Sequence, residues 1–241
     1  MARSLAAVIA ASAALAGCQV HAQEGTGPTV SKNYSVGNFQ KIEVAGPYDV
    51  DVRTGSNVSV SARGSEKLLE RTLVEVEGDK LIIRPEHSHS WFSMGWHSHG
   101  KASFTVTVPQ LNGATIAGSG DIRVDKVAAQ NFEGTVAGSG GLDVGSMNVQ
   151  QVKLSIAGSG GVKAASGKTQ SAKYDIAGSG DIDASGLQAE TLEVSIAGSG
   201  GVKAHSSGTA DVSIMGSGDV EVAGGAKCNV NKAGSGSVRC S

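Results

Sequence analysis

A four-residue motif, Ala-Gly-Ser-Gly, recurs through the second half of the chain and constrains the fold more than any other feature. Met replaces the alanine in one copy. Successive copies are 20 residues apart in the first four intervals and 18 apart in the last two. This near-constant period indicates one structural unit stacked on itself. The first glycines of the seven copies are Gly118, Gly138, Gly158, Gly178, Gly198, Gly216 and Gly234.

Apolar residues alternate with polar ones on both sides of each motif. The fourth and sixth residues after each first glycine are apolar or cysteine, as Ile122 and Val124 are in the first copy. The same alternation leads into the motif, for example in residues 152–156. A period of two predicts a strand with one buried face. Each coil is therefore predicted as strand, Gly-Ser-Gly turn, strand, and a looser stretch such as 184–186.

The fold class that follows is all-β, a parallel β-helix or solenoid of 18–20-residue coils. Stacked parallel strands lie about 4.8 Å apart, so seven coils predict a rod of roughly 30 Å. Glycine suits the sharp corner because a Cβ would forbid its backbone angles or the close approach of a neighbour. We assign residues 111–241 to this regular part, and residues 34–110 to a less regular β region that begins and caps the stack.

A column of outward charges supports this register independently. The fifth residue after each first glycine alternates in sign along all seven copies. In an in-register stack each charge lies between two of opposite sign, and a slip by one coil would bring like charges together. The column consists of Arg123, Asp143, Lys163, Asp183, Lys203, Glu221 and Arg239.

The last coil carries features that fit the end of a stack. Lys232 occupies an inward position that is Ile or Val in earlier coils, and an inward charge discourages edge pairing. Cys228 and Cys240 fall on inward columns about the final turn, which predicts a disulfide. Free thiols or a metal pair are the alternatives, and these need reducing conditions or further ligands.

The first 17 residues have the charge and apolar run of a secretory signal peptide. Leu-Ala-Gly before Cys18 resembles a bacterial lipobox, which predicts lipidation of Cys18; ordinary cleavage after Ala22 is the alternative. Residues 18–33 are polar and predict a flexible linker above this membrane anchor. Either processing route predicts an exported protein of the bacterial envelope, and lipidation predicts an outer-membrane lipoprotein on the periplasmic or surface face.

The N-terminal region repeats the later unit in degenerate form. Residues 39–52 contain Gly46-Pro47-Tyr48 in place of the Gly-Ser-Gly corner. Ser65 is a suitable N-cap for a short helix over 66–71. Strands are expected near residues 57–62, 72–77, 80–84 and 102–108.

Residues 39–52, the strand 78–83, the segment 104–109 and the Gly-Ser-Gly repeats, in this order, resemble the bacterial family "putative auto-transporter adhesin, head GIN domain". The resemblance covers about residues 34–240. It implies a β-helical fold similar to pectin-lyase-like solenoids, no established catalytic residues and a role in cell adhesion.

A histidine-rich loop, 85–101, interrupts the N-terminal region. If it forms a hairpin, its four imidazoles share one face, and neutral imidazoles bind Zn²⁺, Cu²⁺ or Ni²⁺. The alternative is an exposed loop with an aromatic tip that contacts a partner protein or a glycan. The candidate ligands are His87, His89, His97 and His99.

Composition and motifs exclude several function classes. A net charge of −2 argues against a nucleic-acid binder, which needs a basic patch. The repeated glycines lack the helix and acidic residue of a dinucleotide fingerprint. Asp121, Asp181 and Asp219 follow the turns but lie two or three coils apart, and only Asp181 and Asp219 approach carboxylate-pair distances. A polysaccharide-active enzyme is therefore the least favoured interpretation. The sequence thus favours a non-catalytic envelope lipoprotein for adhesion or surface binding to a glycan or protein; a periplasmic structural or stress-related module is the alternative.

Overall fold

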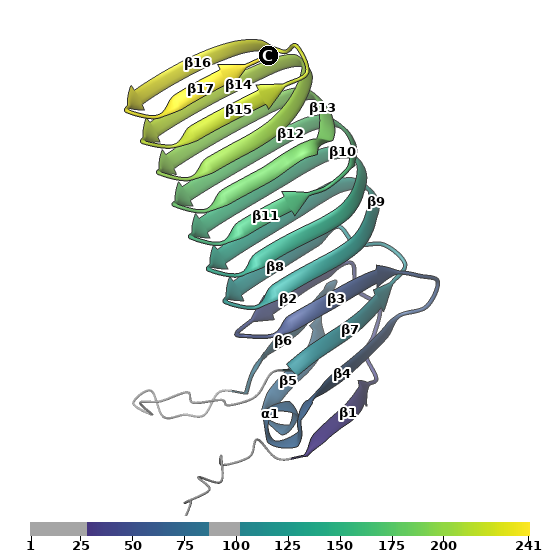
Figure 1. The fold of residues 1–241 in the computed structure, drawn as a ribbon. Coiled ribbons are helices and arrows are strands. Elements are labelled where there is room, and N and C mark those ends of the chain that lie inside the picture. The colour runs from purple at the N-terminus through teal and green to yellow at the C-terminus, as the bar shows by residue number, and fades with distance from the viewer. Residues whose placement is uncertain (1–27, 87–101) are drawn as a thin grey trace, which may run out of the picture.

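The computed structural model describes residues 28–86 and 102–241 and confirms the predicted fold class. The chain forms one 17-stranded sheet that winds into a parallel β-solenoid, with a mixed β region at its N-terminal end (Figure 1). In the described ranges, no helix is long and apolar enough to cross a membrane.

Successive coils pair in parallel and in register. Leu142 lies opposite Ile122 on one side and Val162 on the other, and all three side chains are buried. The stacked apolar columns thus form a continuous core along the rod. The strands of the regular part are β8 (Gly113–Gly118), β9 (Asp121–Gly138), β10 (Gly141–Gly158), β11 (Gly161–Ala164), β12 (Gly167–Gly178), β13 (Asp181–Gly198), β14 (Gly201–Gly216), β15 (Asp219–Ala223), β16 (Lys227–Gly234) and β17 (Ser237–Cys240).

Each full coil has three sides, where the sequence predicted two strands and a looser stretch. In β10 the inward alternation breaks at 145–146 and again at 150–151, where two successive residues face outward. Between these corners lies a short middle side that buries Met147 and Val149. The residues 184–186, predicted as loose, lie within the continuous strand β13. We call the two longer sides the exit side, which follows the Gly-Ser-Gly turn, and the entry side, which leads into the next one.

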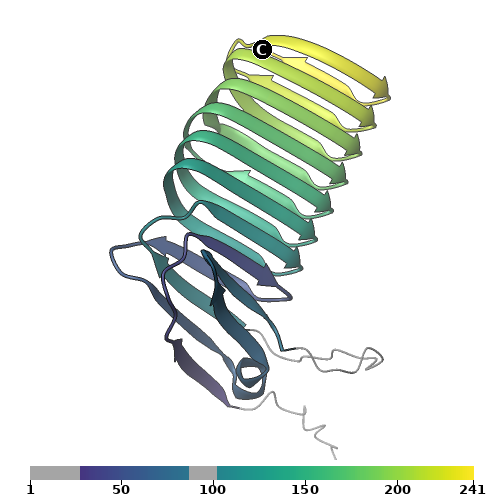
Figure 2. The ribbon, with the colours of Figure 1, turned by 180° about the vertical axis from the view of Figure 1, so that it is seen from behind.

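The Gly-Ser-Gly corners align along one edge of the rod (Figures 1 and 2). Every first glycine has a φ between +130° and +139°, which L side chains rarely adopt. A Cβ on Gly178 would lie 2.3 Å from the carbonyl oxygen of Gly158 in the preceding turn. The turns also bond to one another: the amide of Ser159 donates to the carbonyl of Gly138 at 2.9 Å. Glycine is thus required both by the backbone angle and by the contact between turns.

The alternating charges form a ladder along the exit side. Asp143 lies between Arg123 and Lys163, and Asp51 in the N-terminal region extends the ladder by one step opposite Arg123. Among the described residues no two ladder charges come within ion-pair distance of 4.0 Å. The pKa of Asp183 is nevertheless lowered. The largest cause is its hydrogen bond with Ser185, and the positive charges of Lys163 and Lys203 on either side contribute further.

The N-terminal region contributes one more coil and a mixed cap. β2 (Lys41–Ala45) pairs in parallel with β8, and β3 (Asp49–Thr54) pairs in parallel with β9. Gly46 between them has a φ of +120°, so residues 46–48 replace the Gly-Ser-Gly corner. The remaining elements, which cover this coil, are β1 (Thr29–Tyr34), β4 (Ser59–Ser65), α1 (Glu66–Glu70), β5 (Thr72–Glu77), β6 (Lys80–Pro85) and β7 (Ala102–Val108).

Two details of this region differ from the prediction. Residues 29–33 belong to strand β1, antiparallel to β4, rather than to the predicted linker, because Val30 and Tyr34 pack against the core. Ser65 is the N-cap residue of α1, but its side chain makes no capping hydrogen bond. Ser65 is itself buried at the end of β4, so packing rather than capping positions it there.

The last coil lies on β14 and β15. Cys228 and Cys240 are joined by a disulfide with a Cα–Cα distance of 6.7 Å. Lys232 lies in register with the buried Ile214, and its ammonium group donates to the carbonyl of Gly236 at 2.6 Å. The inward lysine therefore bonds to the final turn instead of entering the core.

Candidate functional site: a polar groove on the entry side

A groove with a volume of about 990 Å³ runs along the entry side. It begins at the N-terminal region and crosses the coils as far as β14, a span of about 29 Å at one strand spacing per coil. We call it the entry groove. Its lining comprises Lys41, Gln110, Asn112, Gln130, Asn131, Phe132, Glu133, Gln151, Val152, Lys153, Ser171, Ala172, Lys173, Thr191, Leu192, Glu193, Thr209 and Asp211.

Two columns of outward side chains form the floor of the entry groove. They occupy the seventh and fifth positions before each first glycine, so the solenoid repeat itself aligns them. The first column offers only amides and hydroxyls, which both donate and accept hydrogen bonds. It consists of Asn131, Gln151, Ser171, Thr191 and Thr209, and the second, charged column consists of Glu133, Lys153, Lys173, Glu193 and Asp211.

The charged column does not alternate as the exit-side ladder does. Lys153 lies opposite Lys173, and Glu193 lies opposite Asp211. Each lysine pairs with its acidic neighbour, at 2.5 Å for Lys173 with Glu193 and 3.6 Å for Lys153 with Glu133. The hydrogen bond that Lys173 donates to Glu193 raises the pKa of Lys173. Like charges side by side are unfavourable in a sheet, so this column is not arranged for stability alone.

Hydroxyl groups stabilise the corner beside the groove, where the backbone ladder is interrupted. Thr169 donates to the carbonyl of Gln150 at 3.1 Å, Thr191 to that of Gln170 at 3.2 Å, and Ser206 to that of Glu190 at 3.2 Å. Backbone carbonyls at a bend need such partners because a neighbouring strand does not reach them. The groove edge is therefore held in one shape along several coils.

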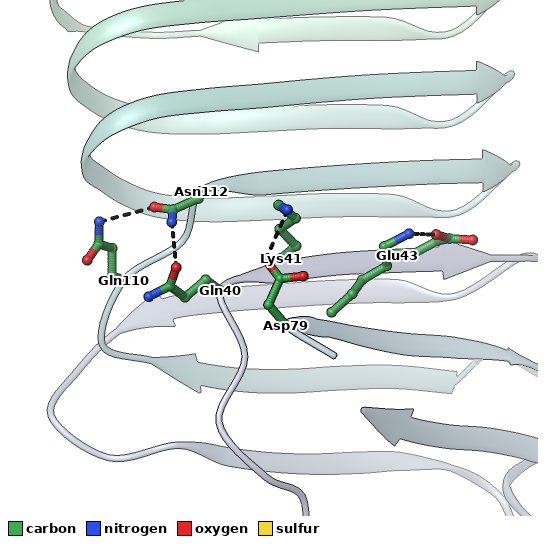
Figure 3. Close-up of polar contacts among 7 residues, drawn as sticks. Gln40, Lys41, Glu43, Asp79, Gln110 and Asn112 are labelled. Carbon is green, nitrogen blue, oxygen red and sulfur yellow. Dashed lines mark hydrogen bonds and ion pairs between the residues drawn. The ribbon is translucent and has the colours of Figure 1, made fainter. Parts of the chain in front are cut away.

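A network of polar contacts holds the N-terminal end of the groove (Figure 3). Asn112 accepts from Gln110 at 3.1 Å and donates to Gln40 at 2.7 Å. Lys41 pairs with Asp79 at 2.9 Å, and this contact lowers the pKa of Asp79. Lys80 beside them pairs with Glu43 at 2.7 Å. Residues from three separate segments thus meet here and join the groove to the cap.

The three aspartates singled out from the sequence as carboxylates beside the turns do not line the entry groove. Asp121 and Asp181 accept the amides of Gly141 and Gly201 in the following coil, both at 2.8 Å. Asp219 accepts both the amide and the hydroxyl of Ser237, and these bonds lower its pKa. These carboxylates bind one coil to the next. A single intervening coil separates Asp181 from Asp219.

The predicted lipidation site and histidine cluster lie outside the described residues, since Cys18 falls in 1–27 and the four histidines fall in 87–101. In the described ranges no group of three or more His, Cys, Asp or Glu side chains is placed to hold a metal ion. The entry groove itself was missed from the sequence. The sequence does contain a pattern that indicates it, namely polar residues at the seventh and fifth positions before the first glycines from Gly138 to Gly216.

Comparison with known proteins identifies the family. The family model described as "putative auto-transporter adhesin, head GIN domain" matches residues 38–226. The chain belongs to this family. The match spans the degenerate coil, the cap apart from β1, and nearly all the regular coils of this head GIN domain. No curated protein matches the chain in sequence.

Solved structures show the same fold for the head GIN domain. The crystal structure of a putative adhesin from Bacteroides fragilis has a TM-score of 0.80 at 22% identity, and the match covers 89% of this chain and 97% of that one. A putative lipid binding protein from Parabacteroides distasonis has a TM-score of 0.69 at 23% identity, covering 90% and 98%. A putative adhesin from Parabacteroides merdae has a TM-score of 0.71 at 18% identity, with the same coverage.

Proposed function

We propose that this head GIN domain protein is a non-catalytic adhesin of the bacterial envelope that binds a linear glycan along the entry groove. The observation that carries the proposal is the continuous column of amide and hydroxyl side chains along the groove floor. Sugar hydroxyls both donate and accept hydrogen bonds, and amide and hydroxyl side chains match them in both roles.

The shape of the entry groove favours an extended ligand over a compact one. Its polar positions recur once per coil, about 4.8 Å apart, so a ligand with its own short repeat meets equivalent groups at each step. A peptide is less suited, because common modes of peptide binding need a free strand edge or an apolar groove. The groove lies on the face of paired strands, and its outward columns are polar.

The proposal also includes a tether. We infer that the chain is exported and lipidated at Cys18, so that the short segment before β1 holds the rod at the membrane. The family of adhesin heads supports an envelope location. The carboxylates of Asp121, Asp181 and Asp219 support the non-catalytic part of the proposal, because each is held by backbone amides of the next coil.

Glycan-array binding with two matched variants tests the groove. Asn131→Ala with Gln151→Ala removes two groove amides, and Asn148→Ala with Gln188→Ala removes two exposed amides from the middle side. The affinity of the first variant for the array ligand should fall about tenfold, since two hydrogen bonds of roughly 0.7 kcal/mol each are lost. The second variant should bind as the wild type does.

Failure of the wild type to bind any array glycan, or equal losses in both variants, would contradict the proposed groove function.

The tether is tested separately by labelling cells with an acyl probe and comparing wild type with Cys18→Ser. Protease treatment of intact cells should then release the rod. A lipidated but protease-inaccessible chain would instead favour a structural module on the periplasmic face.

A further inference from the structure

The tip of the rod, which we define as residues 224–241, leaves the end of the core open. Val230 lies in register with Val212, which is only 2% exposed, yet Val230 itself is 50% exposed. Met215 in the coil below is 70% exposed. These two are the exposed large hydrophobic residues of the described chain, and both lie at this end. In the described ranges, β16 pairs only with β14, and β17 pairs only with β15.

The tip is also the basic end of an acidic protein. Residues 224–241 contain Lys227, Lys232 and Arg239 and no Asp or Glu, while the whole chain has a net charge of −2. Acidic side chains return only in the preceding coil, where Glu221 lies opposite Arg239. The exposed Val230 and three cations therefore lie in the coil beyond the last acidic residue.

One backbone acceptor at this edge is already occupied. In earlier coils the second glycine of the turn offers its carbonyl to the next coil, as Gly200 does to the amide of Asp219 at 3.2 Å. At the last turn the ammonium group of Lys232 occupies the equivalent carbonyl of Gly236. A second copy meeting tip to tip would bring like charges together. The suitable partner is therefore a surface with negative charge that needs no backbone pairing.

We propose that the tip docks onto a bilayer that contains anionic lipids. Cations attract anionic headgroups while exposed apolar side chains enter the boundary between headgroups and acyl chains, and the two contributions reinforce each other. The tip lies at the opposite end of the rod from β1, the strand that follows the N-terminal segment (Figures 1 and 2). Docking at the tip therefore takes place far from the tether, and the entry groove ends in the coil next to the tip, where Thr209 pairs with Lys227.

Vesicle co-sedimentation tests this docking. The exported chain carrying Cys18→Ser, which cannot be acylated, is mixed with vesicles of phosphatidylcholine alone or of phosphatidylcholine and phosphatidylglycerol in equal parts. Binding to the mixed vesicles should be stronger and should weaken with salt. Lys227→Gln with Arg239→Gln should lower this binding about 25-fold, since each cation near an anionic surface contributes roughly a factor of five. Val230→Ser should lower it further.

The matched control is Arg123→Gln with Lys163→Gln, which removes the same charge from the exit-side ladder. It should change binding less than twofold, and thermal unfolding should confirm that each variant is folded. Equal sedimentation with both vesicle types, or equal losses in the tip and ladder variants, would overturn the proposal. So would a wild type that ignores vesicles but forms dimers that the tip variant abolishes, because the tip would then bind a second copy.

Discussion

At the scale of single residues, glycines determine where the coil can turn. The first glycine of each motif has a positive φ and contacts the carbonyl of the glycine one turn earlier. Gly161, three residues after the first glycine Gly158, has neither constraint: the nearest atom to a Cβ there would be 3.8 Å away. Abundance of glycine alone therefore does not tell which positions require it.

Gly178→Ala should destabilise the fold by about 3 kcal/mol, because the new Cβ combines an unfavourable φ with a clash against the preceding turn. Gly161→Ala should change the free energy of unfolding by less than about 0.5 kcal/mol. Urea unfolding followed by far-ultraviolet circular dichroism measures both. Similar destabilisation by the two substitutions would contradict the role assigned to the turn.

At the scale of elements, the exit-side ladder and the charged column of the groove differ in purpose. Ladder charges alternate at every step, so each charge inside the ladder has two neighbours of opposite sign. Such an arrangement adds little to the free energy of unfolding, but it makes a register shifted by one coil unfavourable because like charges would then be adjacent. The groove column contains adjacent like charges, which fits selection for a ligand at that face.

Lys203→Glu places three acidic residues in a row, between Asp183 and Glu221. We expect a loss of about 1 kcal/mol at low salt, largely recovered at 1 M salt, where screening acts over about 3 Å. Lys168→Glu is the control, because its register neighbours are the uncharged Asn148 and Gln188. Urea titrations at both salt concentrations distinguish the two variants, and an equal loss in both would rule out the ladder.

Some features of the coil could be predicted from the sequence, and others could not. Coil period, register, turn glycines and the charge column follow from side chains that repeat at fixed positions. The third side of the coil was missed for two reasons. Its inward residues vary in type between coils, from Met147 to Thr169 to Ser206. The alternation of inward and outward residues also breaks twice within a few residues, once at each end of this side. The groove was missed for a related reason: its lining is polar at every coil, but only the three-dimensional stack brings these separate positions into one surface.

At the scale of the whole molecule, each coil contacts mainly the coils beside it. The free energy of unfolding is therefore close to a sum of contributions from single coils and from pairs of adjacent coils. The last coil has a neighbour on one side only, and the disulfide between Cys228 and Cys240 crosses it. Loss of that bond should therefore affect the end of the rod and leave its middle unchanged.

Cys228→Ser with Cys240→Ser should abolish amide-exchange protection over residues 224–241 while leaving the coils from Asp121 to Gly198 protected. Hydrogen-exchange mass spectrometry measures this directly. The intact mass of the wild type should also rise by two hydrogen atoms on reduction. An unchanged mass would show that the bond does not form in solution, and loss of protection along the whole rod would contradict local fraying.

Contacts limited to adjacent coils have a consequence for how such a protein can vary among its relatives. A central coil can be duplicated or deleted with little change to the cap, the final turn or the remaining coils, because the surfaces exposed by the cut are nearly alike. Length then becomes an adjustable property: the distance between the N-terminal cap and the basic tip can change by one strand spacing at a time while both ends keep their chemistry.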